Sequence, residues 1–571
     1  MLLTQAESIR RRGDSMDSMY KKIKDLPLFD QVEAMTTSLV QTLSINGTEG
    51  EVAIADKIEQ FLRSFPYFNQ HPTHVWIQDL PNDALGRKNV FAHIKGNGSS
   101  KKTVVFHAHI DTVGIEDFGV LQSRANDPNA LLEYFQTYSD EEIRSQALSG
   151  DWMFGRGALD MKSGVAVHLA NVLYFSEHQD EWDGDIIFMA NPVEENQHSG
   201  AIAAVDELLR LRAQEELDYV VAINTDYISA FYPGDTNKYI YTGSGGKLLP
   251  CFYVYGRETH VGQTLNGLDP TLVTAELNKR INNNMELTEH IEGELITPPS
   301  ALYHRDTKEF YNVQTAVTSH LYFNFMVLEA SPKDIMEKLK VIAQEATVEI
   351  SEYYEKNYKK FADVNHFPAN RPNWDMDVYS YVEYCEKLAK QGVDVKAASE
   401  QVLKENPTLE LRELCFKIVD RLRELDQAVT PCVIVFYAPP YCPHNYLTGE
   451  SQRDQVILQT IKEATANTST RTNDTFSVKK FFPYLSDSSY LSLHDTDEEI
   501  DYLVDNFPEW KKIYPVPIKD IRKLNIPSIN VGVYGFDAHR WTERVYKPYS
   551  FETVPKLIRD MTNSWLKAST K

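Results

Sequence analysis

Four short stretches in the first 246 residues are apolar on both faces, which constrains the fold more than any other feature of the chain. They are Asn89–Ile94, Thr103–His107, Asp185–Ala190 and Tyr219–Ile223. Runs of this kind favour a mostly parallel sheet that is covered by helices on both sides. The stretch after Gly164 is apolar nearly all round and predicts a buried helix. We therefore expect an α/β fold, with a mostly parallel sheet flanked by helices.

From about residue 247 the pattern changes. An alternating strand, a helix, a second strand and a long helix are predicted at 248–256, 270–281, 319–327 and 332–350. This order of elements predicts a separate α+β domain inserted into the first domain.

We place the domain boundaries on these changes of pattern. The first domain is predicted at 1–246 and 446–571, and the inserted domain at 247–445. A charged, helix-rich stretch at 353–427 enlarges the inserted domain, and its best helix is predicted to start at Asn406 and Pro407.

Length, charge and cysteine usage exclude several classes of protein. The chain has 571 residues, which is too long for one hydrophobic core. Its net charge of −24 argues against nucleic acid or a membrane surface as a partner. The five cysteines are scattered, and the charged N-terminal segment does not predict a signal peptide. We therefore expect a cytoplasmic protein.

Residues that can bind a metal ion follow the predicted strands at the point where each strand ends. They are His109 and Asp111 after 103–107, Glu194 and Glu195 after 185–190, Asp226 after 219–223, His539 after a further apolar run at 528–534, and Asp160 at the start of the buried helix. Sites in open α/β sheets form at the carboxyl ends of strands, so these side chains should converge. Any one of them alone is more typical of a loop or a solvated surface, and the prediction depends on the joint pattern.

The chemistry of these side chains suits two divalent metal ions. Imidazole and carboxylate ligands favour zinc and, less firmly, cobalt or manganese. One carboxylate can bridge two ions. Adjacent Glu194 and Glu195 side chains diverge, so one would bind metal and the other would take a proton from water. Asp111 lies close enough to His109 to accept a hydrogen bond from its ring and orient it.

Six motifs at these positions resemble a known family. They are FHAHIDTVG, FGRGALDMKSG, PVEEN, INTD, GRETHVG and FDAHRWTERV. In this order they are similar to the motifs of the di-zinc amidohydrolases and exopeptidases, which include aminoacylases, desuccinylases, glutamate carboxypeptidases and peptidase T. The length, the PVEEN motif and the inserted helices resemble most closely the arginine-utilisation subgroup called RocB.

The resemblance implies a role for each candidate residue. Asp160 would bridge the two metals, His109 and Asp226 would complete one site, and Glu195 and His539 would complete the other. Glu194 would be the general base and Asp111 the residue that orients His109. The family also has a cis peptide bond after the bridging aspartate, here Asp160–Met161.

The resemblance further implies a zinc exopeptidase-like catalytic domain and a lid domain through which two copies form a homodimer. His260, in GRETHVG, matches the lid histidine that stabilises the developing oxyanion, in its own subunit or in the partner's. The alternative is a surface histidine in a turn.

Three departures from the family pattern affect substrate choice and oligomeric state. Val193 stands where many relatives have aspartate, an insertion at 116–150 separates His109 from Asp160, and the lid is enlarged at 353–427. The ligands are present despite all three.

These observations predict a zinc-dependent hydrolase that cleaves an amide or peptide bond in a small substrate, an N-acyl amino acid or a dipeptide. The reaction would use metal-activated water and a glutamate base, and the subgroup resemblance implies a place in arginine or related amino-acid catabolism. The alternatives are an aminopeptidase acting on longer peptides and a non-catalytic binding or regulatory protein on the same scaffold.

Overall fold

The computed structural model describes residues 18–368 and 372–567, so most of the charged N-terminal segment lies outside it. The chain forms two compact units. The first comprises the described residues up to 244, together with 445–493 and 517 onward, and the second comprises 245–444 and 494–516.

The first unit contains an eight-stranded sheet in the order β1-β2-β5-β3-β6-β19-β7-β18. Its centre is parallel, because β5, β3, β6 and β19 all run in the same direction. β2 is antiparallel to β5, and β18 is parallel to β7. The strands are β1 Val75–Asp79, β2 Lys88–Lys95, β3 Lys102–His109, β5 Asp185–Asn191, β6 Asp218–Asn224, β7 Asn237–Tyr241, β18 Thr475–Lys479 and β19 Ser528–Asn530. The predicted α/β fold with a mostly parallel sheet is confirmed.

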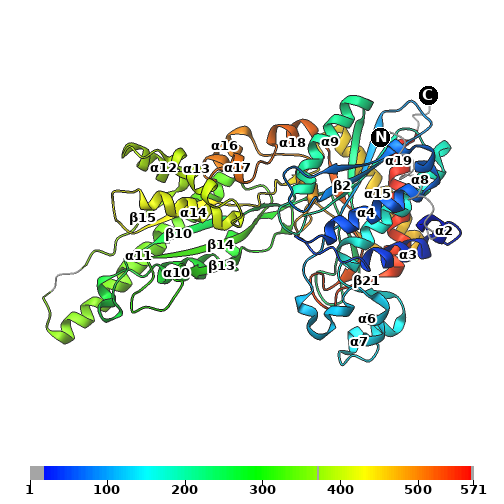
Figure 1. Cartoon of the computed structure of the whole chain (residues 1–571). Helices are drawn as coiled ribbons and strands as arrows, with labels where there is room; N and C mark the ends of the chain where they lie inside the picture. The colour runs from blue at the N-terminus through cyan, green and yellow to red at the C-terminus, as the bar shows by residue number, and fades with distance from the viewer. Residues whose placement is uncertain (1–17, 369–371, 568–571) are drawn as a thin grey trace, which may run out of the picture. The chain divides into compact units, whose positions relative to one another are not determined.

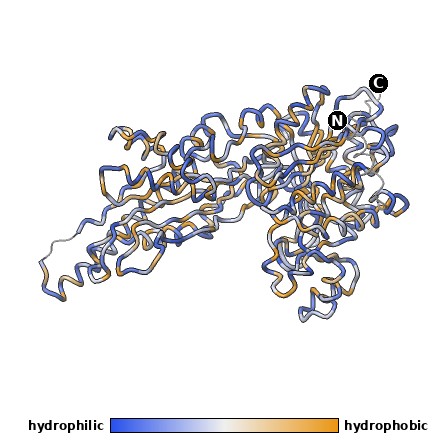
Figure 2. Tube along the Cα trace, viewed as in Figure 1, coloured by the Kyte–Doolittle hydropathy of each residue, from blue (hydrophilic) through white to orange (hydrophobic). Residues whose placement is uncertain are grey.

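Helices cover both faces of this sheet (Figure 1). One hydrophobic core joins the sheet to α3 Leu28–Val40, α4 Gly50–Ser64, α8 Ser163–Glu177, α15 Gln452–Thr472 and α19 Val554–Leu566. The strands of this unit carry many of its hydrophobic residues (Figure 2). On the other face α9, Ser199–Glu215, is attached to β2, where Asn89 Nδ2 donates to the Gly200 carbonyl at 2.9 Å. The predicted buried helix is α8, and its side chains are buried over almost its whole length.

The strand predicted at 528–534 is shorter in the structure, where β19 comprises only Ser528–Asn530. Beyond it the chain runs close to the loop after β6. A side chain at Gly532 would place its Cβ 1.9 Å from the Asp226 carbonyl oxygen, so only glycine fits there. The last apolar residues of this run therefore support the Asp226 loop and do not extend the strand.

The second unit is built on a sheet in the order β13-β14-β10-β16-β15, with β9 pairing beside β14. Its strands are β9 Gly246–Leu248, β10 Pro250–Tyr255, β13 Ser300–Asp306, β14 Thr318–Val327, β15 Asp377–Ser380 and β16 Cys432–Tyr437. Its main helices are α10 Pro270–Ile281, α11 Pro332–Asn365, α12 Tyr381–Lys390, α13 Val395–Glu405, α14 Leu411–Glu424 and α16 Asp497–Asp505.

Three details of the second unit differ from the expectations. Residues 494–516 belong to it, because the buried face of α16 packs on α11. The stretch expected to be helical contains β15, which pairs in parallel with β16. The helix predicted from Asn406 starts at Leu411, because Asn406 ends α13 and the Glu410 side chain accepts hydrogen bonds from the first amides of α14.

Within residues 18–368 and 372–567, no helix has both the length and the apolar character needed to cross a membrane.

Candidate metal centre

The carboxyl ends of the central strands bring the predicted ligands together. His109 is the last residue of β3 and lies beside Asn191 of β5. On the other side of β3, His107 pairs with Asn224 of β6, two residues before Asp226. Because these three strands are parallel and neighbouring, the residues that follow them share one edge of the sheet.

Asp160 reaches the same edge from the turn before α8. The start of α8 lies against the end of β6, where a Cβ at Gly164 would be 2.6 Å from the Thr225 carbonyl oxygen. Glycine therefore allows α8 to approach the strand end. The Asp160–Met161 peptide bond is cis, as the family resemblance implies.

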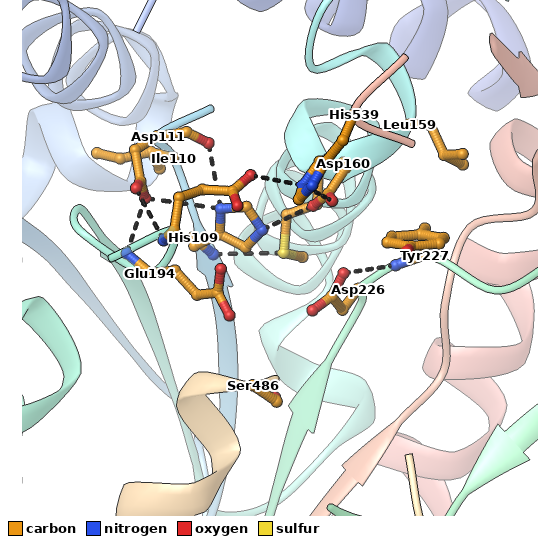
Figure 3. Close-up of polar contacts among 12 residues, drawn as sticks. His109, Ile110, Asp111, Leu159, Asp160, Glu194, Asp226, Tyr227, Ser486 and His539 are labelled. Atoms are coloured by element: carbon orange, nitrogen blue, oxygen red, sulfur yellow. Dashed lines mark hydrogen bonds and ion pairs between the residues drawn. The ribbon is translucent and has the colours of Figure 1, made fainter. Parts of the chain in front are cut away.

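Two groups of candidate ligands share Asp160 (Figure 3). In the first group, His109 Nε2 lies 2.9 Å from Asp160 Oδ1, and Asp226 completes the group. In the second, His539 Nε2 lies 3.0 Å from both Asp160 Oδ2 and Glu195 Oε1. The ligand atoms within each group lie within 4.8 Å of one another.

The electrostatics of these groups fit divalent cations. Burial and the neighbouring Asp160 charge raise the pKa of both Asp226 and Glu195. Burial opposes ionisation of Asp160 as well, but hydrogen bonds from His109 and His539 outweigh it and hold the pKa of Asp160 below its ordinary value. Three buried carboxyl groups this close need positive charge to ionise together, and two metal ions would supply it.

Asp111 has a wider role than the sequence predicted. Its carboxylate accepts hydrogen bonds from the backbone N–H groups of Glu194 and Glu195, at 3.0 and 3.1 Å. It also accepts one from Asn46 Nδ2 at 2.9 Å. His109 Nδ1 lies 3.2 Å from the Asp111 carbonyl oxygen and 3.6 Å from its carboxylate. Asp111 therefore connects the His109 ring to the backbone of the glutamate pair.

The Glu194 carboxylate is buried beside the first group of ligands. Burial raises the pKa of Glu194 well above its ordinary value, against the opposing charge of His109. His198 Nδ1 lies 4.0 Å from Glu194 Oε1 and 3.0 Å from Asp487 Oδ1. Glu194 thus has a buried polar neighbour that the sequence pattern did not indicate.

Two pairs of residues at the site were missed. One is His198 with Asp487, which lies outside the strand ends and the six motifs from which the candidate residues were named. The other is Arg156 with Glu543, which form a buried ion pair at 2.7 Å. Glu543 Oε1 accepts the backbone N–H of Asp160 at 3.2 Å. Arg156 lies in the motif FGRGALDMKSG and Glu543 in the motif FDAHRWTERV. These motifs are the signal that could have indicated the pair.

His260 lies in the second unit, where it caps the short helix Val261–Asn266. Its Nδ1 accepts the Gly262 N–H at 3.0 Å, and its side chain is exposed. The role predicted for His260 therefore stays a prediction.

Residues 89–253 match the sequence model of Peptidase family M28. The chain is 52% identical over 544 residues to protein RocB of Bacillus subtilis (strain 168), covering 95% of this chain and 96% of RocB. It is 33% identical over 546 residues to the uncharacterized protein YqjN of the same organism, covering 95% and 97%.

Among solved structures, an M20 family metallo-carboxypeptidase, Sso-CP2 of Sulfolobus solfataricus, has a TM-score of 0.50 at 11% identity, covering 94% of this chain and 99% of that one. This likeness shows the shared fold. With most of its length aligned to RocB at 52% identity and a peptidase match over the segment that contains four of the five candidate ligands, the chain belongs to the RocB family and is a metal-dependent hydrolase.

Proposed function

We propose that this protein hydrolyses an amide or peptide bond in a small substrate, an N-acyl amino acid or a dipeptide, with two divalent metal ions. The observation that carries the proposal is the sharing of Asp160. Its two carboxylate oxygens point to two different histidines, and each histidine belongs to a separate group of ligands.

The ligand roles follow from these groups. Asp160 would bridge the ions, His109 and Asp226 would hold one, and Glu195 and His539 would hold the other. Zinc fits this set of imidazole and carboxylate donors best, and cobalt or manganese could replace it. When bound, such ions polarise the scissile carbonyl and lower the pKa of water.

Glu194 is the proposed general base. Its side chain is buried next to the ligands, and its backbone N–H is fixed by Asp111. It would accept a proton from the attacking water and pass that proton to the departing amine. Neighbouring Glu195 cannot do this, because its carboxylate is engaged with His539.

The domain roles belong to the same proposal. The first unit would be the catalytic domain, and the second would be a lid that carries His260 to the developing oxyanion. A cytoplasmic homodimer joined through the lid, acting in arginine or related amino-acid catabolism, completes it. Sedimentation analysis would test the dimer: a single species at the mass of one chain would contradict it.

The test is a substrate screen with zinc-loaded protein. The panel contains N-acyl amino acids, dipeptides and peptides of three or more residues, and released amine is measured. We expect turnover of the first two classes, and a rate about 10²- to 10⁴-fold lower after Glu194→Gln. Turnover of only the longer peptides would favour an aminopeptidase, and no turnover of any class would favour a binding or regulatory role.

A further inference from the structure

The insertion at 116–150 contacts the segment that carries His539. It contains η2 Glu116–Arg124, α6 Pro128–Phe135 and α7 Glu141–Ser149. It leads directly into β4, Trp152–Phe154, which pairs with β21, Arg544–Tyr546. Both α6 and α7 contact β4, and α7 also reaches β21 through Gln146 and Arg544 (Figure 1). The residues directly after the insertion therefore pair with residues 544–546, at the end of the segment 537–546 that carries His539 (the His539 segment).

His539 is the least buried residue of its ligand group, so its position depends most on contacts made by the residues around it. Its side chain is 48% exposed, whereas those of Asp160 and Glu195 are 7% and 8% exposed. His539 and nearby Asp537 both have a left-handed backbone, with φ of 65° and 62°. A left-handed backbone is uncommon for residues other than glycine, although Asp and His adopt it more often than most, and contacts around the segment help to hold it.

The insertion supplies an aromatic contact of this kind. The Trp541 ring lies 5.4 Å from that of Phe135 and 5.3 Å from that of Tyr138, with a third contact to Tyr134 at 6.5 Å. Phe135 is fully buried and stacks in turn on Phe154 of β4. Trp541 is thus fixed in an aromatic cluster two residues after His539.

Two polar contacts reinforce the aromatic one. Arg544 donates from Nε to Gln146 of α7 and from a terminal nitrogen to Asp537. Arg156 donates to Asp117 of the insertion at 2.8 Å and to Glu543 at 2.7 Å. Since Glu543 accepts the Asp160 N–H, this second contact extends from the insertion to the bridging ligand.

We propose that the insertion holds the His539 segment in the conformation that binds metal, with Trp541 as the positioning residue. This proposal depends on the metal centre proposed above. Alternate residues of the segment make different contacts. His539 faces the metal site, Trp541 enters the insertion, and Glu543 holds the Asp160 backbone.

The test measures zinc affinity at each site by competition with a chromophoric chelator. In Trp541→Ala, one of the two zinc ions should bind about 10- to 100-fold more weakly, the range for residues that orient metal ligands. The other zinc ion, held by the group without His539, should keep an affinity close to that in the parent. Trp541→Phe should restore much of the affinity, because a ring returns to the cluster.

Two further variants complete the design. Tyr138→Ala removes the contact from the side of the insertion, should Trp541→Ala fail to fold. Trp76→Ala is the matched control, because Trp76 is also partly buried but stacks on Phe91 in β2. The control should leave both zinc affinities unchanged.

Hydrogen exchange of the metal-free proteins gives a readout that is independent of zinc. Amides in 537–546 should exchange faster in Trp541→Ala than in the parent, while those of α8 should not change. If the parent binds two zinc ions and the variants match it in affinity and exchange, the positioning role is refuted and the metal centre stands. A parent chain that binds fewer than two zinc ions refutes the metal centre and this proposal with it.

Discussion

Replacing Glu194 or Glu195 by glutamine should produce two different defects, one in the rate of the reaction and the other in metal binding. Glu194→Gln removes the proposed base and leaves its loop anchored, because Asp111 binds the backbone N–H of this residue and not its side chain. Glu195→Gln acts on a carboxylate that lies 3.0 Å from His539 and belongs to the second group of ligands. The first variant should lose rate and keep metal, and the second should lose metal.

The size of the first effect follows from the role proposed for Glu194. A positioned general base contributes about 10²- to 10⁴-fold in rate. At about 1.36 kcal/mol for each factor of ten, Glu194→Gln should raise the activation free energy by about 2.7–5.4 kcal/mol. The loss should fall on kcat, with KM little changed, because no contact of Glu194 holds substrate or metal in the proposed scheme.

The assay combines steady-state kinetics on a substrate from the screen with metal analysis of the same samples. Glu194→Gln should keep the metal content of the parent. Glu195→Gln should lose about half of it, because one ligand group is damaged. The assignment of the base is refuted if Glu194→Gln retains a rate close to that of the parent, or if its loss of rate is matched by a loss of metal.

Three further perturbations test the fold around the site. His168 is fully buried, stacks on Phe106, and burial lowers its pKa to about 3. Below its ordinary pKa of about 6.5 the unfolded chain binds a proton at His168 that the folded chain does not, so this residue should lower stability by about 1.4 kcal/mol per pH unit toward pH 3. Buried His107, whose pKa is also lowered to about 3, adds a slope of its own. His168→Leu should reduce the slope by about 1.4 kcal/mol per pH unit in unfolding followed by hydrogen exchange of α8, and an unchanged slope would contradict the assignment. Glu543→Gln leaves the buried Arg156 without its nearest carboxylate, so the free energy of unfolding should drop by about 3 kcal/mol; a change within about 0.5 kcal/mol would show that the pair contributes little. Chelation should lower the thermal midpoint and added zinc should restore it, because metal binds the folded chain; identical melting curves would argue against binding.

Much of the first unit could be predicted because its signals are local. The runs at 103–107, 185–190 and 219–223 are apolar on both faces, and each became a strand at the centre of the sheet. His109, Glu195 and Asp226 could be named for the same reason, since each follows such a run closely, whereas Asp160 was named from its place at the start of the buried helix. Their convergence then needed only the rule that sites form at the carboxyl ends of parallel strands.

The residues that were missed depend on contacts between distant parts of the chain. Asp487 meets His198 across 289 residues, and Glu543 meets Arg156 across 387. No strand end or motif at Asp487 indicates that it contacts His198, four residues after Glu194. The same reason explains residues 494–516, whose place in the second unit is decided by packing on α11 and not by any local pattern.

The start of α14 shows a different kind of error. Asn406 followed by Pro407 is a strong signal for the start of a helix, but here Asn406 closes the preceding helix. Glu410 takes the capping position because its side chain reaches the amides of Arg412 and Glu413. Leu414 and Ile418 are buried and belong to the helix with either start, so the apolar pattern alone could not fix where α14 begins.

The most direct test of the account is the metal content per chain, measured on protein purified without added metal or chelator and again after zinc loading. The two groups of ligands that share Asp160 predict close to two ions per chain after loading. Asp160→Asn, which alters the residue common to both groups, should lower the content at both sites. A parent chain that holds no more than a trace of metal after loading would contradict the central claim.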